Sequence, residues 1–372
     1  MIKVAVARKT YNVIDYQAAG NGVTDDTQAF LQAWGAVCKD ERSPHLLIPS
    51  GKIFLIKKIR LEGPCKSNTI HIKVDGNITA PNYIWATEMT NLITFHAINN
   101  LVFHGPGTID GQGEIWWDCY NKARCTRPYL LEFVGCSNLV LRHISLKDSP
   151  NKHLAFSSCT NLTIHAVTIT APGNSPNTDG IVMQDCQNVQ ITGCIIGTGD
   201  DCIAILTNTY NVDISRISCG PGHGISIGSL GKDNTVAAVE RIHIHDSTIY
   251  NALTGARIKT WQGGSGYARN ITYERISMAN VTTPIVIDQT YYTSFEVSTD
   301  VALSDIVFRD IHGTTTEKVA IKLECSAIVP CKELVFDDVT LTRIGDDQTA
   351  YATSQNAYGI TNGTIIPSIY FN

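Results

Sequence analysis

The polar residues best suited to chemistry gather between positions 174 and 261 of this 372-residue chain. Asp179, Asp201 and His223 follow one another at equal intervals in the sequence. If the chain coils with that repeat, their side chains lie above one another at about 4.8 Å, the separation of neighbouring strands. Two carboxylates that close repel each other, so each must stay solvated or give up its charge. This cost favours a functional site over a purely structural column.

A third carboxylate directly precedes the second. On a regular strand Asp200 would face away from Asp201, so both reach one cleft only if the chain bends, which Gly199 permits. Taken singly, Asp-Gly and Gly-Asp-Asp are ordinary turn sequences, and the repeated equal step is what favours a site. Asp179, Asp200 and Asp201 would also suit Ca²⁺, but a histidine in the same column makes a hard cation less attractive.

Two basic residues follow that histidine by roughly one coil. Arg257 and Lys259 are separated by a single residue, so on a strand they share a face and can hold a ligand carboxylate. Trp261 continues this face, where packing explains it equally well. His243 and His245 also share a strand face, but two histidines without a third ligand are more often surface residues than a metal site.

The elements that must position these residues are short strands. Asn followed by alternating apolar residues recurs at positions 100, 138, 161, 188, 211 and 270, and the long gap before the last position hides another turn. Such alternations with Gly and Asn turns between them are typical of stacked parallel strands. The pattern predicts an all-β parallel β-helix. A propeller would need longer repeats with hairpin turns, and a leucine-rich repeat would need a leucine frame.

One segment has helical periodicity. Residues Asp25 to Lys39 begin with a capping-box-like pair, Asp25 and Gln28, and continue with an apolar stripe. We expect this helix to cover the open end of the coil, because an uncovered terminal coil exposes edge groups and core side chains. The chain shows no linker, so we expect an N-terminal extension, residues 1–11, and a single domain, residues 12–372.

Composition excludes several other classes. With 29 basic and 34 acidic residues the net charge is −5, which argues against a nucleic-acid partner gripped by a general positive field. The sequence lacks the Cys-x-x-Cys pair of structural zinc sites, an apolar run long enough for a membrane partner and the Gly-x-Ser-x-Gly motif of acyl-transfer enzymes. The apolar stretch within residues 1–8 is too short for the hydrophobic region of a secretory leader. Five Asn-x-Ser/Thr patterns, at Asn77, Asn161, Asn270, Asn280 and Asn362, suit a secreted glycoprotein.

Together these motifs resemble the signature of the polygalacturonases, glycoside hydrolase family 28. The resemblance rests on Ser175-Pro-Asn-Thr-Asp-Gly180, Gly199-Asp-Asp-Cys202, Gly222-His-Gly224 and Arg257-Ile-Lys259. The longer stretches 219–231 and 257–266 resemble the plant branch, and the likeness extends over nearly the whole chain. It implies a right-handed parallel β-helix of about ten coils.

The resemblance also implies a reaction, the hydrolysis of α-1,4 bonds of polygalacturonan with inversion. Asp200 would protonate the leaving oxygen, while Asp179 and Asp201 would hold and activate the water. Neighbouring negative charge is expected to keep Asp200 protonated. His223 would tune the site by a hydrogen bond to an aspartate or to the sugar. No metal or organic cofactor is implied, because carboxylates and water suffice.

The same resemblance supplies candidate substrate-binding residues and partners. Asn177 would position the substrate, Arg257 and Lys259 would bind its carboxylates, Tyr291 would serve a subsite, and His153 would line an outer one. The expected partner is pectin or polygalacturonate, with a polygalacturonase-inhibiting protein as a further candidate. The protein is expected to be monomeric and secreted to the cell wall.

The resemblance also bears on the twelve cysteines. Where plant relatives have a cysteine shortly after the subsite tyrosine, this chain has none before Cys325, so one disulfide of the usual pattern is expected to be absent. The remaining pairs expected are Cys202–Cys219, Cys325–Cys331 and Cys38–Cys65. We expect buried thiols stacked in the coil at four positions, Cys136, Cys159, Cys186 and Cys194.

Alternatives stay open at the level of sequence. Attack within the polymer is favoured over attack from its end, but an exo-acting galacturonan hydrolase remains possible because loops decide the mode. A calcium-dependent pectate lyase would share the fold and lose activity on chelation. An inactive pectin-binding β-helix would keep the basic pair without turnover.

Overall fold

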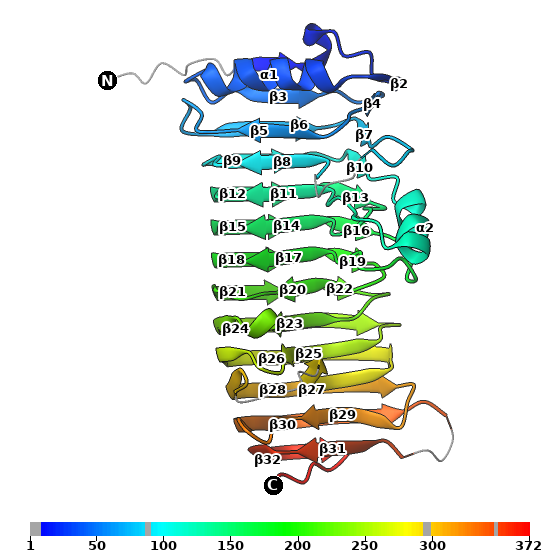
Figure 1. The fold of residues 1–372 in the computed structure, drawn as a ribbon, viewed down its shortest axis with the longest axis vertical. Coiled ribbons are helices and arrows are strands. Elements are labelled where there is room, and N and C mark those ends of the chain that lie inside the picture. Colours follow the sequence, from blue (N-terminus) through cyan, green and yellow to red (C-terminus); the bar gives the residue numbers. More distant parts are fainter. Residues whose placement is uncertain (1–8, 86–90, 293–298, 346–348) are drawn as a thin grey trace. The chain divides into compact units, whose positions relative to one another are not determined.

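The computed structural model describes residues 9–85, 91–292, 299–345 and 349–372. The chain forms two compact units. Unit 1 comprises Met1–Ala171 with Ser175–Thr178, and unit 2 comprises Pro172–Asn174 with Asp179–Asn372. Each unit is a stack of coils whose strands pair in parallel (Figure 1). The single domain expected for residues 12–372 stays a prediction.

Unit 1 gives one strand per coil to one sheet and two short strands per coil to a second sheet. Its elements are β1 (Thr10–Asn12), η1 (Val13–Tyr16), β2 (Asn21–Asp25), α1 (Thr27–Lys39), β3 (His45–Ile48), β4 (Ile53–Leu55), β5 (Ile59–Glu62), β6 (Ile70–Val74), β7 (Asn77–Thr79), β8 (Ile93–His96), β9 (Leu101–His104), β10 (Thr108–Asp110), α2 (Glu114–Ala123), β11 (Leu131–Val134), β12 (Ser137–Arg142), β13 (Ser145–Lys147), β14 (Leu154–Ser157), β15 (Thr160–His165) and β16 (Thr168–Thr170).

Unit 2 repeats the plan with longer strands towards its C-terminal end. Its elements are β17 (Ile181–Gln184), β18 (Gln187–Thr192), β19 (Ile195–Gly197), β20 (Ile203–Ile205), β21 (Thr209–Ser215), β22 (Ser218–Cys219), β23 (Ile225–Leu230), η2 (Lys232–Asn234), β24 (Val236–Tyr250), β25 (Thr254–Trp261), β26 (Ser265–Val281), β27 (Thr283–Tyr292), β28 (Ala302–Thr315), β29 (Val319–Glu324), β30 (Cys331–Arg343), β31 (Tyr351–Gln355) and β32 (Ala357–Ile366).

Equivalent side chains stack along the inside of each unit. In unit 1 the rings of Phe95, Phe133 and Phe156 follow one another at centroid distances of 4.5 and 5.3 Å. Cys136 and Cys159 lie buried in successive coils, and the hydrogen bond between their thiols together with burial raises the pKa of Cys136. Parallel pairing in register brings like residues together, so the core consists of columns of similar side chains.

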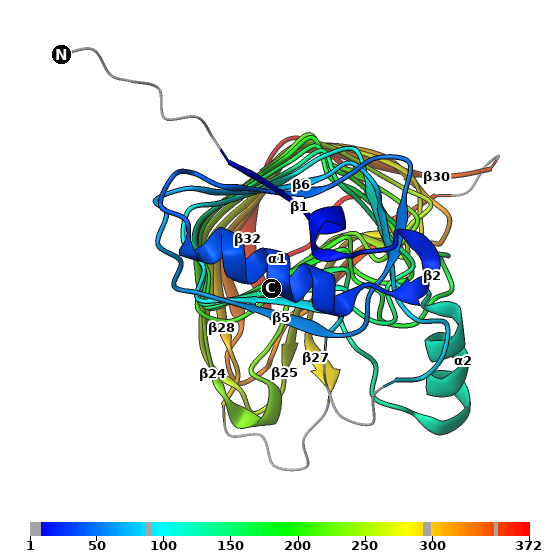
Figure 2. The same ribbon diagram turned by 90° about the horizontal axis from the view of Figure 1, so that it is seen from above.

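The helix α1 covers the first coil of unit 1, as expected. It packs on β1, β3 and β5 (Figure 2). The residues of the predicted apolar stripe are all buried, namely Ala29, Phe30, Ala33, Trp34 and Val37. The expected capping box is wrong, because the helix begins at Thr27 and its N-cap, Asp26, makes no side-chain cap. The Asp26 carboxylate instead accepts from the amides of Ala19 and Gly20, and Asp25 accepts from Thr27.

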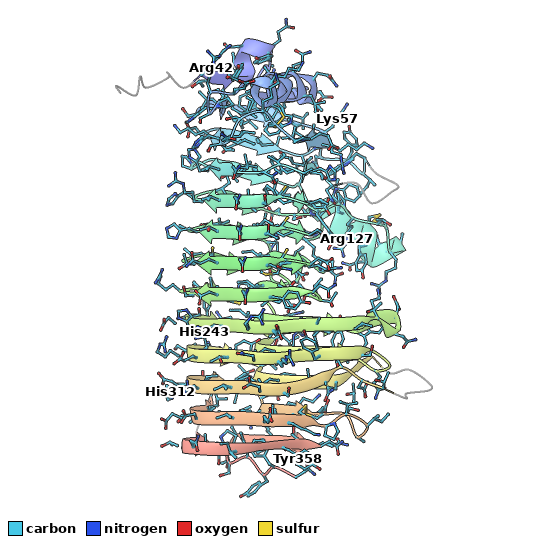
Figure 3. The ribbon with its side chains drawn as sticks, turned by 90° about the vertical axis from the view of Figure 1, so that its left-hand side faces the viewer. Arg42, Lys57, Arg127, His243, His312 and Tyr358 are labelled. Atoms are coloured by element: carbon cyan, nitrogen blue, oxygen red, sulfur yellow. A yellow bond between two sulfur atoms is a disulfide. The ribbon has the colours of Figure 1, made fainter. Side chains whose placement is uncertain are left out.

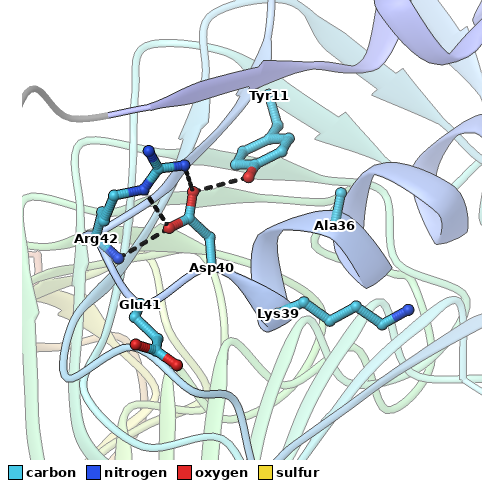
Figure 4. Close-up of a pocket in the computed structure, with 6 residues that line it drawn as sticks. All are labelled: Tyr11, Ala36, Lys39, Asp40, Glu41 and Arg42. Atoms are coloured by element: carbon cyan, nitrogen blue, oxygen red, sulfur yellow. Dashed lines mark hydrogen bonds and ion pairs between the residues drawn. The ribbon is translucent and has the colours of Figure 1, made fainter.

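Directly after α1, the carboxylate of Asp40 holds the chain against β1. Asp40 accepts hydrogen bonds from the Tyr11 hydroxyl at 2.8 Å and from the Arg42 guanidinium at 2.9 Å (Figure 4). The Arg42 guanidinium and the Tyr11 hydroxyl hold the pKa of Asp40 well below its ordinary value. The network joins β1 to the segment after α1 and so holds the helix on the first coil.

The structure has all three expected disulfides, Cys38–Cys65, Cys202–Cys219 and Cys325–Cys331. A fourth, Cys119–Cys125, was not predicted from the sequence, and neither was α2, whose Trp116 and Trp117 are buried. The four cysteines expected as thiols are buried and unbridged. No helix in the described ranges is long and apolar enough to cross a lipid bilayer.

The recurring asparagines explain the turns between strands. Asn100, Asn138 and Asn161 have φ of 58°, 55° and 56°, a left-handed conformation that asparagine tolerates better than most residues. Their amides form a ladder in unit 1, because Asn161 donates to Asn138 and Asn138 donates to Asn100, both at 2.9 Å. In unit 2, Asn211 donates likewise to Asn188 at 3.0 Å. The repeat seen in the sequence is therefore a stack of turns.

Replacing Asn138, the middle asparagine of the ladder, separates its two contributions to stability, the left-handed backbone conformation and the ladder hydrogen bonds. We expect Asn138→Ala to lower the free energy of unfolding by about 1–3 kcal/mol, through left-handed strain and the lost ladder bonds. Asn138→Gly removes the same ladder bonds without the strain, so it should cost less. Denaturant unfolding measures both variants, and equal stability of the two would contradict this account of the turns.

Candidate active site

The predicted catalytic residues of unit 2 lie just before strands of the sheet β17-β20-β23-β25-β27. Ile181 pairs with Ile203, and Ile203 pairs with Ile225, so the register advances by the same step in both coils. Asp179, Asp201 and His223 therefore occupy the same position, just before each of these three isoleucines. Backbone bonds extend the pairing, from the amide of Gly180 to the carbonyl of Asp201 and from the amide of Cys202 to that of Gly224, both at 2.9 Å. The predicted coil repeat is confirmed.

Asp201 is the most enclosed carboxylate of this group, with 1% of its surface exposed. Its Oδ1 accepts from the Ser226 hydroxyl at 2.7 Å and from the Arg257 guanidinium, and its Oδ2 accepts from the Lys259 ammonium at 2.8 Å. A buried carboxylate is costly unless it is paired and fully hydrogen-bonded, and here both oxygens are. Asp201 is thus a fixed negative charge held by two cations.

The basic pair occupies the face that its spacing predicts. Arg257 and Lys259 lie on β25, only 8% and 6% exposed, and both point at Asp201. Burial alone lowers the pKa of Arg257, but the attraction of Asp201 outweighs burial and the net shift is upward. These cations were expected to bind substrate, and their shared contact with Asp201 was not predicted. Their contact with substrate stays a prediction.

Asp200 and Asp201 reach one site because the chain bends at Gly199 and Asp200, as expected. Asp200 Oδ1 accepts from the backbone amide of Asp201 at 2.8 Å and lies 3.0 Å from Nδ1 of His223. His223 occupies the same register position as Asp201, but its imidazole contacts the preceding residue, Asp200. The side chain of Asp200 is 16% exposed, far more than that of Asp201.

Two glycines fix the place of the histidine. A Cβ on Gly222 would lie 2.7 Å from the carbonyl oxygen of Asp200, and one on Gly224 would lie 2.2 Å from that of Gly255. Gly224 also has φ of 75°, a conformation that favours glycine. The Gly-His-Gly sequence thus lets the backbone of His223 approach its neighbours closely, and its amide donates to the Asp200 carbonyl at 2.9 Å.

The site does not fit a hard cation. Asp200, Asp201 and His223 each offer one ligand atom within 4.8 Å of the others, which is the spacing of a possible metal site. However, both oxygens of Asp201 already bind Arg257 and Lys259. A divalent ion placed there would face two fixed positive charges, so the donor set argues against the Ca²⁺ alternative.

The remaining predicted residues are placed separately. Tyr291, at the end of β27, is 38% exposed, and its ring centroid lies 5.3 Å from the Lys259 ammonium. Asn177 belongs to unit 1, where its Oδ1 accepts from Arg127 at 2.7 Å and its carbonyl accepts from Lys152. His153, also in unit 1, has no exposed surface, and its Nε2 accepts from a backbone amide, which argues against its predicted contact with substrate.

No role was predicted for Ser226 from the sequence. This side chain is fully buried, and its hydroxyl donates to Asp201 while accepting from Nε of Arg257 at 3.0 Å. The available signal was a lone hydroxyl in the otherwise apolar strand segment 225–227. Since buried polar groups need partners, such a residue points to a polar neighbour on the next coil.

The fold and the site together define a class, a parallel β-helix protein with clustered carboxyl groups beside a buried basic pair. The chain belongs to the family Glycosyl hydrolases family 28, which residues 38–360 match. It is 41% identical to the probable polygalacturonase At3g15720 of Arabidopsis thaliana, over 96% of this chain and 80% of that protein. It is 40% identical to polygalacturonase-2 of Solanum lycopersicum, over 94% and 78%.

Solved structures show the same fold. A polygalacturonase from Erwinia carotovora aligns with a TM-score of 0.76 at 26% identity, covering 96% of this chain and 98% of that one. The endo-xylogalacturonan hydrolase of Aspergillus tubingensis aligns with a TM-score of 0.84 at 23% identity, covering 97% and 100%. The expected right-handed parallel β-helix and the expected glycoside hydrolase of the polygalacturonase family are both confirmed.

Removal of the Ser226 hydroxyl tests how strongly the catalytic rate depends on the hydrogen bonds that hold Asp201. We expect Ser226→Ala to lower kcat about 10-fold or more, because Asp201 and Arg257 each lose a charge-assisted bond worth roughly 1.5–3 kcal/mol. Steady-state kinetics on polygalacturonate measures this. Ser247→Ala removes another buried hydroxyl of unit 2, bonded at 2.8 Å to a carbonyl, and should spare kcat. Equal effects of the two variants would argue against a catalytic role for the Ser226 bond.

Proposed function

We propose that this protein hydrolyses the α-1,4-glycosidic bonds of de-esterified polygalacturonan with inversion of the anomeric centre. The observation that carries the proposal is the unequal environment of two adjacent carboxylates. Asp201 is ionised and clamped by two cations, whereas Asp200 is partly exposed and bonded to a histidine. Hydrolysis of a glycosidic bond needs one protonated and one ionised carboxyl group, and unequal environments supply both.

Asp200 is the residue best placed to act as the general acid. Its carboxylate contacts a backbone amide and the ring of His223, and its side chain is more exposed than that of Asp201. The Asp200–His223 pair can hold one proton at an Nδ1–Oδ1 distance of 3.0 Å. A proton held there can pass from Asp200 to the oxygen of the leaving sugar, which leaves Asp200 ionised beside a neutral His223.

Asp179 and Asp201 hold the attacking water. Oxygen atoms of Asp200 and Asp201 lie within 4.8 Å, which is short of the roughly 6.5–9.5 Å that separates acid and base in inverting enzymes. Both oxygens of Asp201 already accept from cations, so Asp201 orients the water, and the proton passes to Asp179. Asp179 precedes β17 by register, one coil before Asp201, and is 5% exposed.

The charge balance of the site favours an anionic sugar. Arg257 and Lys259 carry two positive charges against the single negative charge of Asp201, so one net positive charge remains. Polygalacturonate carries one carboxylate per sugar and can meet that charge, whereas a neutral polysaccharide cannot. Tyr291 lies beside Lys259 and is exposed enough to contact a sugar ring.

The test is a product analysis on de-esterified polygalacturonate, with and without chelator. We expect new reducing ends, no unsaturated products and no effect of the chelator. Asp200→Asn should lower kcat by about 10²–10⁴, the usual contribution of a general acid. Asp310→Asn is the matched control, an exposed aspartate of unit 2 that pairs with His312, and it should leave the rate unchanged.

Other outcomes would select the rival functions. Unsaturated products that vanish with chelator would establish a lyase and overturn the roles given to the aspartates. Binding of polygalacturonate without any product would establish a binding protein. The length of the products tests the mode of attack, because internal cleavage yields a ladder of oligomers, whereas exo attack releases only the terminal unit.

We also propose that the protein acts outside the cell as a monomer, with pectin as its partner and an inhibitor protein as a further candidate. Four disulfides suit an oxidising compartment. The asparagines of all five glycosylation patterns are exposed. Secretion from a plant host, followed by a mass measurement before and after deglycosylation, tests the localisation. An unmodified intracellular product would contradict it.

A further inference from the structure

A second cluster of titratable side chains lies on the other sheet of unit 2. Asp213 on β21 pairs in register with His243 on β24, and His245 lies on the same strand and the same face. Asp213, His243 and His245 each offer one ligand atom within 4.8 Å of the others. The aspartates of the active site precede strands of the sheet β17-β20-β23-β25-β27, whereas Asp213, His243 and His245 lie on strands of the other sheet, so this cluster is separate from the active site.

The distances suit a tetrahedral metal ion. Oδ1 of Asp213 lies 3.5 Å from Nδ1 of His243 and 3.3 Å from Nε2 of His245. Metal–ligand bonds of about 2.0–2.1 Å at a tetrahedral angle place the ligand atoms of Zn²⁺ about 3.3 Å apart. All three ligand atoms lie within 4.8 Å of one another, close enough to face a single ion.

Outer carboxylates set the tautomer of each histidine. Nε2 of His243 lies 3.0 Å from Oε2 of Glu274, and Nδ1 of His245 lies 2.6 Å from Oδ2 of Asp246. A carboxylate only accepts hydrogen bonds, so the nitrogen of His243 that faces Glu274 carries the proton. Nδ1 of His245 lies 2.6 Å from Asp246 and 3.5 Å from Nη2 of Arg275, and the shorter contact places the proton there. The opposite nitrogens, Nδ1 of His243 and Nε2 of His245, then turn their lone pairs towards Asp213. Metal-binding histidines characteristically have such a carboxylate partner.

An ion-pair network without a metal explains the geometry less well. To donate to Asp213 as well, both imidazoles would have to be charged, and their rings are stacked at 4.3 Å with an interplanar angle of 20°. Two parallel imidazolium rings repel at that distance. Their contacts with Asp213, at 3.3 and 3.5 Å, are also long for hydrogen bonds. A shared cation would satisfy both lone pairs and the carboxylate together.

We propose that Asp213, His243 and His245 bind a divalent transition-metal ion of the Zn²⁺ type at the surface of unit 2. Two imidazoles and a carboxylate are ligands that such ions prefer over Ca²⁺ or Mg²⁺. The ion has access, because the side chains of Asp213 and His243 are 45% and 41% exposed, and Figure 3 shows His243 at the edge of the unit. Bound there, the ion joins β21 to β24 and stabilises two successive coils.

Calorimetric titration of the chelator-treated full chain with Zn²⁺ alone tests this site. We expect one site that weakens at least 10-fold in His243→Gln and in Asp213→Asn, which replace exposed side chains and should fold. His312→Gln, an exposed histidine paired with Asp310, is the matched control and should bind as before. Asp200→Asn should also bind as before, because it removes the other candidate cluster.

A second measurement links the ion to the fold. Zn²⁺ should raise Tm of the original chain in a concentration-dependent way and leave Tm of His243→Gln unchanged, because binding to the folded state alone stabilises it. Metal-free His243→Gln should hydrolyse polygalacturonate at the original rate. No binding below millimolar Zn²⁺, unchanged affinity in His243→Gln, or loss of the site in His312→Gln or Asp200→Asn would each overturn the proposal.

Discussion

The pairing of one buried carboxylate with two buried cations is the interaction on which the active site depends. Asp201, Arg257 and Lys259 are each more than nine-tenths buried, and none of them is stable there alone. Together with the Ser226 hydroxyl they satisfy one another, and the group keeps one excess positive charge. The same pairing satisfies both oxygens of Asp201 and so holds this carboxylate in one position.

The coil supplies the precision that this pairing needs. Ser226 and Arg257 pair directly on β23 and β25, and Asp201 precedes β20, the next strand of the same sheet. Each group therefore comes from a different coil, at a spacing set by backbone hydrogen bonds rather than by flexible loops. Glycines on both sides of His223 bring the imidazole to Asp200. The strands thus position Ser226 and Arg257, and the turns just before the strands position the aspartates and His223.

The sequence predicted what depends on local repetition. Equal steps along the chain fix the register directly, so the column of Asp179, Asp201 and His223 followed from spacing alone, and the asparagine pattern marked the turns. Which group a side chain bonds depends instead on the direction in which the side chain points and on the length of each coil, and coil length varies along the chain. The bend at Gly199 decides that His223 bonds Asp200, and nothing in the spacing showed it.

Other side-chain contacts could not be predicted because they cross longer coils or more than one coil. Asp213 and His243 pair across a longer coil, so no short motif joins them in the sequence. Arg257 and Lys259 were predicted to share a face, but their common partner comes from two coils earlier. The helix α2 and the Cys119–Cys125 disulfide lie in an excursion outside the repeat, and the repeat therefore carried no signal for them.

A double-mutant cycle between Asp201 and Lys259 tests the central claim most directly. The quantity measured is the free energy of unfolding of Asp201→Asn, of Lys259→Met and of the double variant. If mutual neutralisation holds the site together, the single variants are each destabilised by about 3–5 kcal/mol and the double variant by much less than their sum. Additive losses would show that the two charges are independent and would contradict the account.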